Sequence, residues 1–141
     1  GSHLAQGLVE AGHRVRVLDN LHAGHRSNLA AVAADVELVE GDCSDAGTAE
    51  RATRGMDVVY HEAAVPSVAR SVEDPASSHR NSATATLTML VAARNAGVAA
   101  WAVPYGYNAG EPIAEAKPQR IFANLLEVAA HVRAHAPSAR N

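Results

Sequence analysis

Two periods of apolar residues alternate along the chain, one typical of helices and the other of strands. Apolar residues three or four positions apart predict helices over residues 4–11, 28–34, 45–54, 76–96 and 122–134. Between them, valine-rich stretches predict strands over residues 14–19, 36–39, 57–61 and 98–103. The remaining segments, including the proline-containing stretches 62–75 and 104–118, are expected to be loops.

The residues at the helix ends agree with these boundaries. Asp45 can accept a hydrogen bond from the first turn of the third helix, and Gly97 follows the end of the longest one. In that longest helix the side chains of Leu87, Leu90 and Val91 fall on one face, which is therefore its apolar side.

Helices that alternate with strands in this order are typical of a parallel sheet covered on both faces. We therefore expect an α/β fold with a doubly wound parallel sheet, in a single domain over residues 1–141. In such sheets ligands bind beyond the carboxyl ends of the strands. Functional residues are therefore expected in the loops that follow the strands, at residues 19–24, 41–45, 61–71 and 103–110.

Composition and charge exclude several other classes of protein. Of the 141 residues 48% are hydrophobic and 19% charged, with a formal net charge of −3, which is typical of a globular chain. No run of lysine and arginine suggests nucleic-acid binding, and no apolar run approaches the roughly 20 residues of a membrane span. With no signal-peptide pattern and a single cysteine, Cys43, we expect a cytoplasmic protein without disulfides.

Asp19 is the first candidate for chemistry, because it ends the strand predicted over residues 14–19. An acidic residue there can accept hydrogen bonds from both hydroxyls of an adenosine ribose, and it repels a 2′-phosphate, so it favours NAD over NADP. A strand-terminal Asp is also a common turn residue. The dinucleotide-binding fingerprint places this acid about 20 residues after a glycine loop, and counting back from Asp19 reaches Gly1.

Five short motifs support a named resemblance. They are GSHL at 1–4, VLDNL at 17–21 with Gly24, VEGD at 39–42, DVVYH at 57–61 with Ala63 and Ala64, and PSVARSVEDP at 66–75. From residue 1 to about residue 98 the chain resembles the extended short-chain dehydrogenase/reductases, and within them the NAD-dependent epimerase/dehydratase family, close to nucleotide-sugar 4-epimerases. The resemblance implies a Rossmann-like sheet, NAD as the cofactor, and a nucleotide sugar as the substrate of the parent protein.

The resemblance implies roles for residues at both ends of the dinucleotide. Gly1 would be the last glycine of the phosphate loop, at a helix N-terminus where backbone N–H groups receive the pyrophosphate. Asp19 and Asn20 would hold the adenosine ribose, and Gly24 would let the loop turn close by. On this alignment the strand that should precede the glycine loop is absent, so we expect an N-terminally truncated domain.

Four more residues receive a role from the same resemblance. Asp42 and Cys43 would flank the adenine, with the carboxylate of Asp42 accepting from the exocyclic amine. Ala63 and Ala64 would let the backbone approach the pyrophosphate and the nicotinamide ribose. Simple packing of a helix on a sheet explains the two alanines equally well. His61, at the end of a predicted strand, is expected to pack near the cofactor loop rather than to act in catalysis.

The catalytic residues of the family are not found. These enzymes use a tyrosine as acid and base, with a lysine one helical turn later that lowers the pKa of the phenol. None of the three tyrosines in this chain is followed by a lysine at that spacing. The register of the resemblance puts Leu125 and Ala129 at the two positions, and residues 99–104 lack the expected hydroxyl partner. We therefore expect no catalytic residue in this chain.

One further constellation has two interpretations. Glu127, His131 and His135 lie four residues apart on the last predicted helix, a spacing at which two histidines and a carboxylate can chelate a metal ion. A polar, solvated helix face is the interpretation we favour, because histidine is frequent throughout the chain. No metal site is expected.

Two functions remain open. In the first, the chain is the NAD-binding part of a nucleotide-sugar epimerase or dehydratase, without the substrate domain and inactive by itself. In the second, it is a non-catalytic nucleotide-binding or protein-interaction module, a pseudoenzyme. In either case the missing first strand exposes strand edges and apolar helix faces. We therefore expect a marginally stable or homo-oligomeric protein that binds NAD weakly or not at all.

Overall fold

The computed structural model describes residues 1–65, 67–105, 114 and 118–135. The chain divides into two compact units, Gly1–Val98 and Ala99–Asn141. The single domain expected over residues 1–141 stays a prediction. In the part of the chain that the structure describes, no helix is long and apolar enough to cross a membrane. Most of the loop expected at residues 104–118 lies outside the described residues.

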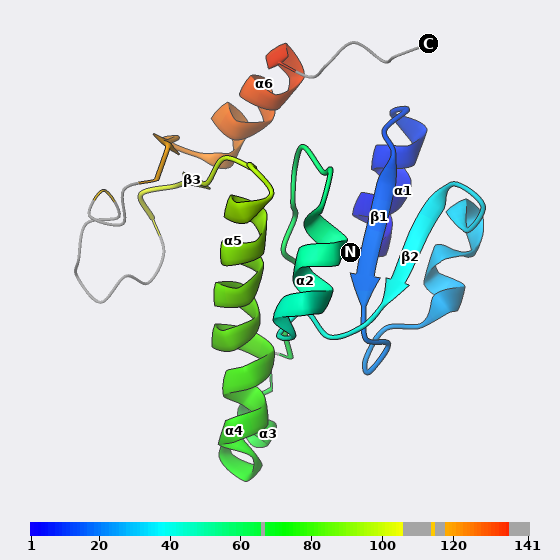
Figure 1. Ribbon diagram of the computed structural model, residues 1–141, viewed down its shortest axis with the longest axis vertical. Coiled ribbons are helices and arrows are strands. Elements are labelled where there is room, and N and C mark those ends of the chain that lie inside the picture. The colour runs from blue at the N-terminus through cyan, green and yellow to red at the C-terminus, as the bar shows by residue number, and fades with distance from the viewer. Residues whose placement is uncertain (66, 106–113, 115–117, 136–141) are drawn as a thin grey trace. The chain divides into compact units, whose positions relative to one another are not determined.

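The first unit is built on two parallel strands, β1 (Val15–Asp19) and β2 (Val36–Glu40), both of which the sequence predicts. Helix α1 (Ser2–Glu10) precedes β1 and runs antiparallel to it, and the 3-10 helix η1 (Arg26–Val32) joins the two strands (Figure 1). The register pairs Asp19 with Glu40. The two strands therefore end side by side, at the edge where the sequence places the cofactor.

Apolar side chains cover both faces of this small sheet. On one face the buried residues Ala5, Leu29 and Val32 join α1 and η1 to the strands, with partly buried Val9, Val15, Val17, Val36 and Leu38 around them. On the other face a second cluster holds Ala49, Met89 and Ala92, with Leu18, Cys43 and Val59 packed against it. Successive residues of a strand point to opposite faces, so neighbouring Val17 and Leu18 belong to different clusters.

Helix α2 (Ala46–Thr53) is held at both ends. At its start the carboxylate of Asp45 accepts a hydrogen bond from the backbone N–H of Thr48 at 2.8 Å, as the sequence predicts. At its end the guanidinium of Arg16, on β1, donates to the carbonyl oxygens of Ala52 and Arg54 at 3.0 Å each. Because the last carbonyls of a helix lack partners within it, Arg16 ties α2 to the sheet.

The long helix predicted over residues 76–96 is confirmed as three consecutive segments. They are α4 (Pro75–His79), the π-helical η2 (Arg80–Thr84) and α5 (Ala85–Asn95). The carboxylate of Asp74 caps the first segment by accepting from the backbone N–H of Ser77 at 2.9 Å. Gly97 follows the last segment with a φ of 84°, in the left-handed region that favours glycine.

The face on which α5 packs is not the one with the largest apolar side chains. Leu87, Leu90 and Val91 are 64, 56 and 49% exposed, whereas the buried residues of α5 are Ala85, Met89 and Ala92. Small side chains let two helices approach closely, and α2 supplies Ala49 to the cluster that holds Met89 and Ala92. The apolar face that the sequence predicts for this helix is therefore left uncovered by the part of the chain that the structure describes.

Two predictions in the first unit are wrong. Residues 57–61 belong to no strand, because no strand of the described chain forms hydrogen bonds with them, and a strand exists only with a partner. The stretch expected to be a loop over residues 62–75 contains helix α3 (Val68–Glu73). The oxygen of Ser67 caps this helix by accepting from the backbone N–H of Arg70 at 3.3 Å.

The second unit contains two short parallel strands and a helix. The strands are β3 (Trp101–Ala102) and β4 (Arg120–Ile121), and the helix is α6 (Leu125–His135). The strand predicted over residues 98–103 is thus reduced to two residues, and β4 has no counterpart in the prediction. Buried Phe122 meets Trp101 edge to face, with ring centroids 5.3 Å apart.

Candidate functional site

Asp19 lies at the carboxyl end of β1 and is half-buried. Its Oδ1 accepts a hydrogen bond from the backbone N–H of Leu21 at 2.8 Å, and the side-chain oxygen of Asn20 accepts from the backbone N–H of His22 at 3.0 Å. Two successive turns of this kind fold the loop tightly, and Leu21 has a φ of 55°, which is rare for a leucine. The loop thus fixes Oδ1, one of the two carboxylate oxygens of Asp19.

Gly24 brings the same loop back over the carboxylate of Asp19. A Cβ atom at position 24 would lie 2.9 Å from Oδ2 of Asp19 and 3.3 Å from Oδ1. Both distances are shorter than ordinary contacts, so glycine is the residue that leaves this carboxylate in place. Asp19 and Gly24, which the sequence assigned to one ribose site, are in direct contact.

The loop after β2 joins this cluster. The backbone N–H of Gly41 donates to the carbonyl oxygen of Asp19 at 3.1 Å, which connects the ends of the two strands. Oδ1 of Asp42 accepts from the backbone N–H of Ser44 at 2.8 Å. Asp42 and Cys43 are both half-buried and follow the strand that pairs with β1. The structure therefore brings Asp42 and Cys43 to the edge that carries Asp19.

The thiol of Cys43 has a pKa above its ordinary value of 9.0. Burial is the largest cause, because it disfavours the thiolate, and the negative charge of Asp42 adds to it. A hydrogen bond with the backbone of Cys43 acts in the opposite direction, and the carboxylate of Asp19 raises the pKa further. Both carboxylates thus act on one thiol, which stays neutral at physiological pH.

Gly1 immediately precedes α1, and its carbonyl oxygen accepts from the backbone N–H of Ala5 at 3.0 Å. No side chain caps this end of the helix. The N–H groups of a first helical turn have no partner within the helix and can receive an anion. Because α1 runs antiparallel to β1, its first turn lies toward the carboxyl end of the strand (Figure 1).

Ala63 and Ala64 lie in an open groove of about 630 Å³ beside the long helix. Its lining consists of His61, Glu62, Ala63, Ala64, Ser82, Ala83, Thr86, Leu87 and Leu90. Nε2 of His61 lies 3.1 Å from Oγ1 of Thr86, which fastens the segment before α3 to α5. Further along α5, Oγ1 of Thr88 donates to the carbonyl oxygen of Ser44 at 3.5 Å. Helix α5 therefore contacts both His61, which lines the groove, and the loop after β2.

The positions where the resemblance puts the catalytic tyrosine and lysine lie on α6. They are occupied by Leu125 and Ala129, four residues apart, whose hydrocarbon side chains cannot transfer a proton. Lys117, the only lysine of the chain, lies outside the described residues.

The residues of the alternative metal site have other contacts. Oε2 of Glu127 accepts from the backbone N–H of Ala123 at 3.0 Å, so this carboxylate caps the start of α6. The ring of His131 packs edge to face on Trp101 with centroids 5.0 Å apart, a contact that a solvated helix face does not make. The side chain of His135 lies outside the described residues. Among the residues that are described, no three metal-binding side chains form a cluster.

Sequence reasoning missed an ion pair at the same edge, between Arg26 and Glu40. Arg26 begins η1 directly after the loop that carries Gly24, and Glu40 is the last residue of β2. The alternation of apolar residues predicted that the two strands pair. It did not predict that the side chain of Arg26 contacts the end of β2.

A parallel sheet covered on both faces, with an acidic residue and a close-fitting glycine at the strand ends, is typical of nucleotide-binding α/β proteins. Residues 1–117 match the model of the NAD dependent epimerase/dehydratase family. The chain belongs to this NAD-dependent family.

Individual relatives agree with the family. A UDP-glucose 4-epimerase from Streptomyces lividans is 38% identical over 128 residues, which cover 85% of this chain and 38% of that protein. The UDP-glucose 4-epimerase from Corynebacterium glutamicum is 37% identical over 123 residues, 84% of this chain and 36% of that protein. The chain therefore spans little more than a third of the length of these relatives.

Solved structures identify the fold. The UDP-glucose 4-epimerase from Thermus thermophilus, in complex with NAD, aligns with a TM-score of 0.64 and 36% identity over 79% of this chain and 38% of that one. A dTDP-glucose 4,6-dehydratase from Streptomyces venezuelae, with NAD bound, gives 0.64 and 34% over 74% of this chain and 36% of that one. The α/β arrangement described above is thus part of a Rossmann-type fold, as the sequence predicts.

Proposed function

We propose that this chain binds the adenosine half of NAD at the carboxyl ends of β1 and β2. One observation carries the proposal: the carboxylate of Asp19 is held by the backbone of Leu21, and Gly24 approaches it closely without a side chain that would displace it. With Oδ1 fixed by the loop, Oδ2 can accept a hydrogen bond from a ribose hydroxyl. A hydrogen bond to a charged group is worth about 1.5–3 kcal/mol, so this contact is a main source of affinity.

The neighbouring residues fit the rest of the adenosine. Asn20 is exposed next to Asp19 and adds a second polar group toward the ribose. Oδ2 of Asp42 can accept from the exocyclic amine of adenine while Oδ1 holds the backbone of Ser44. The neutral, half-buried thiol of Cys43 supplies an apolar contact for the flat face of the base.

The other half of the dinucleotide extends from the same edge in this proposal. The pyrophosphate lies at Gly1, where the first N–H groups of α1 are free of side-chain caps. The nicotinamide ribose follows toward Ala63 and Ala64, whose small side chains keep the groove open. When bound, NAD supplies a hydride acceptor, whereas the residues named here only bind and orient it.

The whole protein, in this proposal, is an NAD-dependent epimerase or dehydratase that acts on a nucleotide sugar. Relatives named as UDP-glucose 4-epimerases support that class of substrate. On the register of the resemblance, Leu125 and Ala129 occupy the positions of the tyrosine and lysine that act as acid and base. The chain by itself is therefore inactive.

The ribose assignment is tested by titrating the chain with adenosine 5′-monophosphate and with NAD, followed by nuclear magnetic resonance. Asp19→Ala should weaken binding roughly ten- to hundredfold, because a hydrogen bond to a charged group is lost. Asp35→Ala is the matched control, since Asp35 is an exposed carboxylate just before β2, at the opposite end of the strand from Glu40. Equal binding by the Asp19→Ala variant and the natural chain would contradict the assignment.

A non-catalytic interaction module is the second candidate, and one observation favours it. Leu87, Leu90 and Val91 form an exposed apolar row on α5, and such rows are typical of contacts with another protein. In this case the chain forms a homo-oligomer through α5. Sedimentation over a range of concentrations should then show association that Leu90→Ser abolishes. Turnover of UDP-glucose by the chain above background would instead exclude both an inactive chain and a pseudoenzyme.

A further inference from the structure

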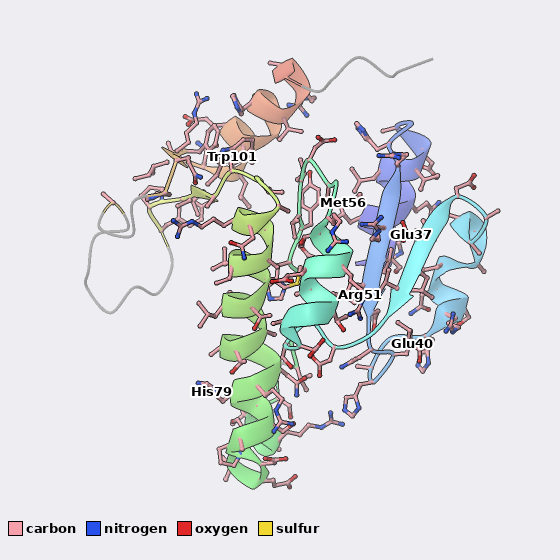
Figure 2. All side chains as sticks on the ribbon, viewed as in Figure 1. Glu37, Glu40, Arg51, Met56, His79 and Trp101 are labelled. Atoms are coloured by element: carbon pink, nitrogen blue, oxygen red, sulfur yellow. The ribbon has the colours of Figure 1, made fainter. Side chains whose placement is uncertain are left out.

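The ion pair between Arg26 and Glu40 lies directly beside the proposed ribose site. Glu40 ends β2 and is the register partner of Asp19, the last residue of β1. Partner residues in a parallel ladder point their side chains to the same face of the sheet. The carboxylates of Asp19 and Glu40 therefore leave the sheet on one face, one strand apart, and the guanidinium of Arg26 binds the second of them. Figure 2 shows Glu40 at this end of β2 and Glu37 further back on the same strand.

The loop between the two strands carries groups with opposite preferences for the cofactor. Asp19 repels a phosphate on the ribose 2′-oxygen, whereas an arginine near that oxygen accommodates one. Arg26 is the only arginine or lysine between Asp19 and Glu40. Gly24 packs on the carboxylate of Asp19, and Arg26 follows two residues later. The cation is therefore carried by the segment that joins β1 to β2, which we call the ribose loop.

We propose that Glu40 is a specificity-determining residue for the cofactor. By pairing with Arg26 it holds the only arginine of the ribose loop away from the 2′-oxygen and neutralises its charge. The site then accepts a free 2′-hydroxyl through Asp19 and rejects a 2′-phosphate. This inference rests on the proposed function, because it concerns the same ribose site.

The pair contributes little to the stability of the fold, which makes the role testable. The side chains of Arg26 and Glu40 are 62% and 56% exposed, and exposed ion pairs add little to the free energy of unfolding. Replacing either residue should therefore leave the chain folded. Glu37, on the same strand as Glu40, provides a control, because its carboxylate is 59% exposed and pairs with Arg16 of β1 at 2.8 Å.

The experiment compares two nucleotides, adenosine 5′-monophosphate and adenosine 2′,5′-bisphosphate, by nuclear magnetic resonance titration of the full chain. The natural chain should prefer the monophosphate. Glu40→Gln releases the guanidinium of Arg26, and the affinity for the bisphosphate relative to the monophosphate should rise roughly three- to tenfold, less at high salt. Arg26→Gln should change the ratio little, and the double variant should return to the ratio of the natural chain.

Three outcomes would overturn the inference. The first is an unchanged ratio of affinities in Glu40→Gln. The second is an equal rise of that ratio in Glu37→Gln. The third is a raised ratio that persists in the double variant, which lacks Arg26. The proposed function fails separately, and this inference with it, if the natural chain binds neither nucleotide at millimolar concentration. Binding by the natural chain together with an unchanged ratio in Glu40→Gln contradicts only the role of Glu40.

Discussion

Gly24→Ala tests the ribose site by adding a single methyl group. The new Cβ would lie 2.9 Å from Oδ2 of Asp19 and 3.3 Å from Oδ1, where ordinary contacts begin at 3.4 Å. The carboxylate must therefore move by about 0.5 Å or rotate. Since the backbone N–H of Leu21 holds Oδ1 at 2.8 Å, the movement disturbs the orientation that the ribose hydroxyl requires.

The expected effects on binding and on stability differ in size. Loss of one hydrogen bond to a charged group costs about 1.5–3 kcal/mol, so the affinity for adenosine 5′-monophosphate should fall roughly ten- to hundredfold. The backbone of Gly24 does not lie in the left-handed region, so alanine fits the main chain. Alanine also restricts the unfolded chain, which stabilises by about 0.4–1 kcal/mol and offsets part of the contact strain. The melting temperature should therefore change little.

Titration calorimetry or nuclear magnetic resonance measures the affinity, and thermal unfolding measures the stability. Gly7→Ala is the matched control, because a Cβ at position 7 meets no atom within 4 Å and should leave binding unchanged. If Gly24→Ala binds the nucleotide within about twofold of the natural chain, the orientation of the Asp19 carboxylate does not control ribose binding and the reasoning is refuted.

Three further predictions concern the sheet and its edge. Arg16→Met leaves the last carbonyls of α2 without their donor, so the free energy of unfolding in urea should fall by about 2 kcal/mol, and by much less in the exposed control Arg14→Met. Hydrogen bonds from Thr48, first from its side chain and then from its backbone, lower the pKa of Asp45 below 3.8. The stability that Asp45 supplies is therefore present above that value and lost as the pH falls through the lower folded pKa, and Asp45→Asn should remove this dependence in acid denaturation. Because the pKa of Cys43 is raised, its thiol should react with a disulfide reagent more slowly in the folded chain than in urea. Asp42→Asn should speed the reaction of the folded chain. Equal rates in the folded chain and in urea would contradict the burial of the thiol.

Local signals in the sequence were sufficient for β1, β2 and the helices around them. The alternation of apolar residues in β1 matches the two faces of the sheet, with Val17 in one cluster and Leu18 in the other. Asp45 caps α2, and Gly97 with its φ of 84° follows α5. These features depend on a few neighbouring residues, so a pattern of neighbouring residues predicts them.

The predictions that failed depend on contacts between residues that are distant in the sequence. Residues 57–61 have the composition of a strand, but the described chain offers them no ladder partner, and Val58 stays 43% exposed. On α5 the pattern marks Leu87, Leu90 and Val91, yet the helix packs on α2 through Met89 and Ala92, which share a cluster with Ala49. Apolar periodicity locates a face without saying which neighbour covers it.

The sequence alone determined that Asp19 ends a strand, that Gly24 follows in the next loop, and that Asp42 comes directly after the second strand. Only the tertiary structure decided that Gly24 rests on the carboxylate of Asp19 and that Glu40 stands beside it with Arg26 attached. The physical reason is the register of the parallel ladder. Hydrogen bonds between two strands far apart in the chain set which side chains end together, and no local pattern contains that information.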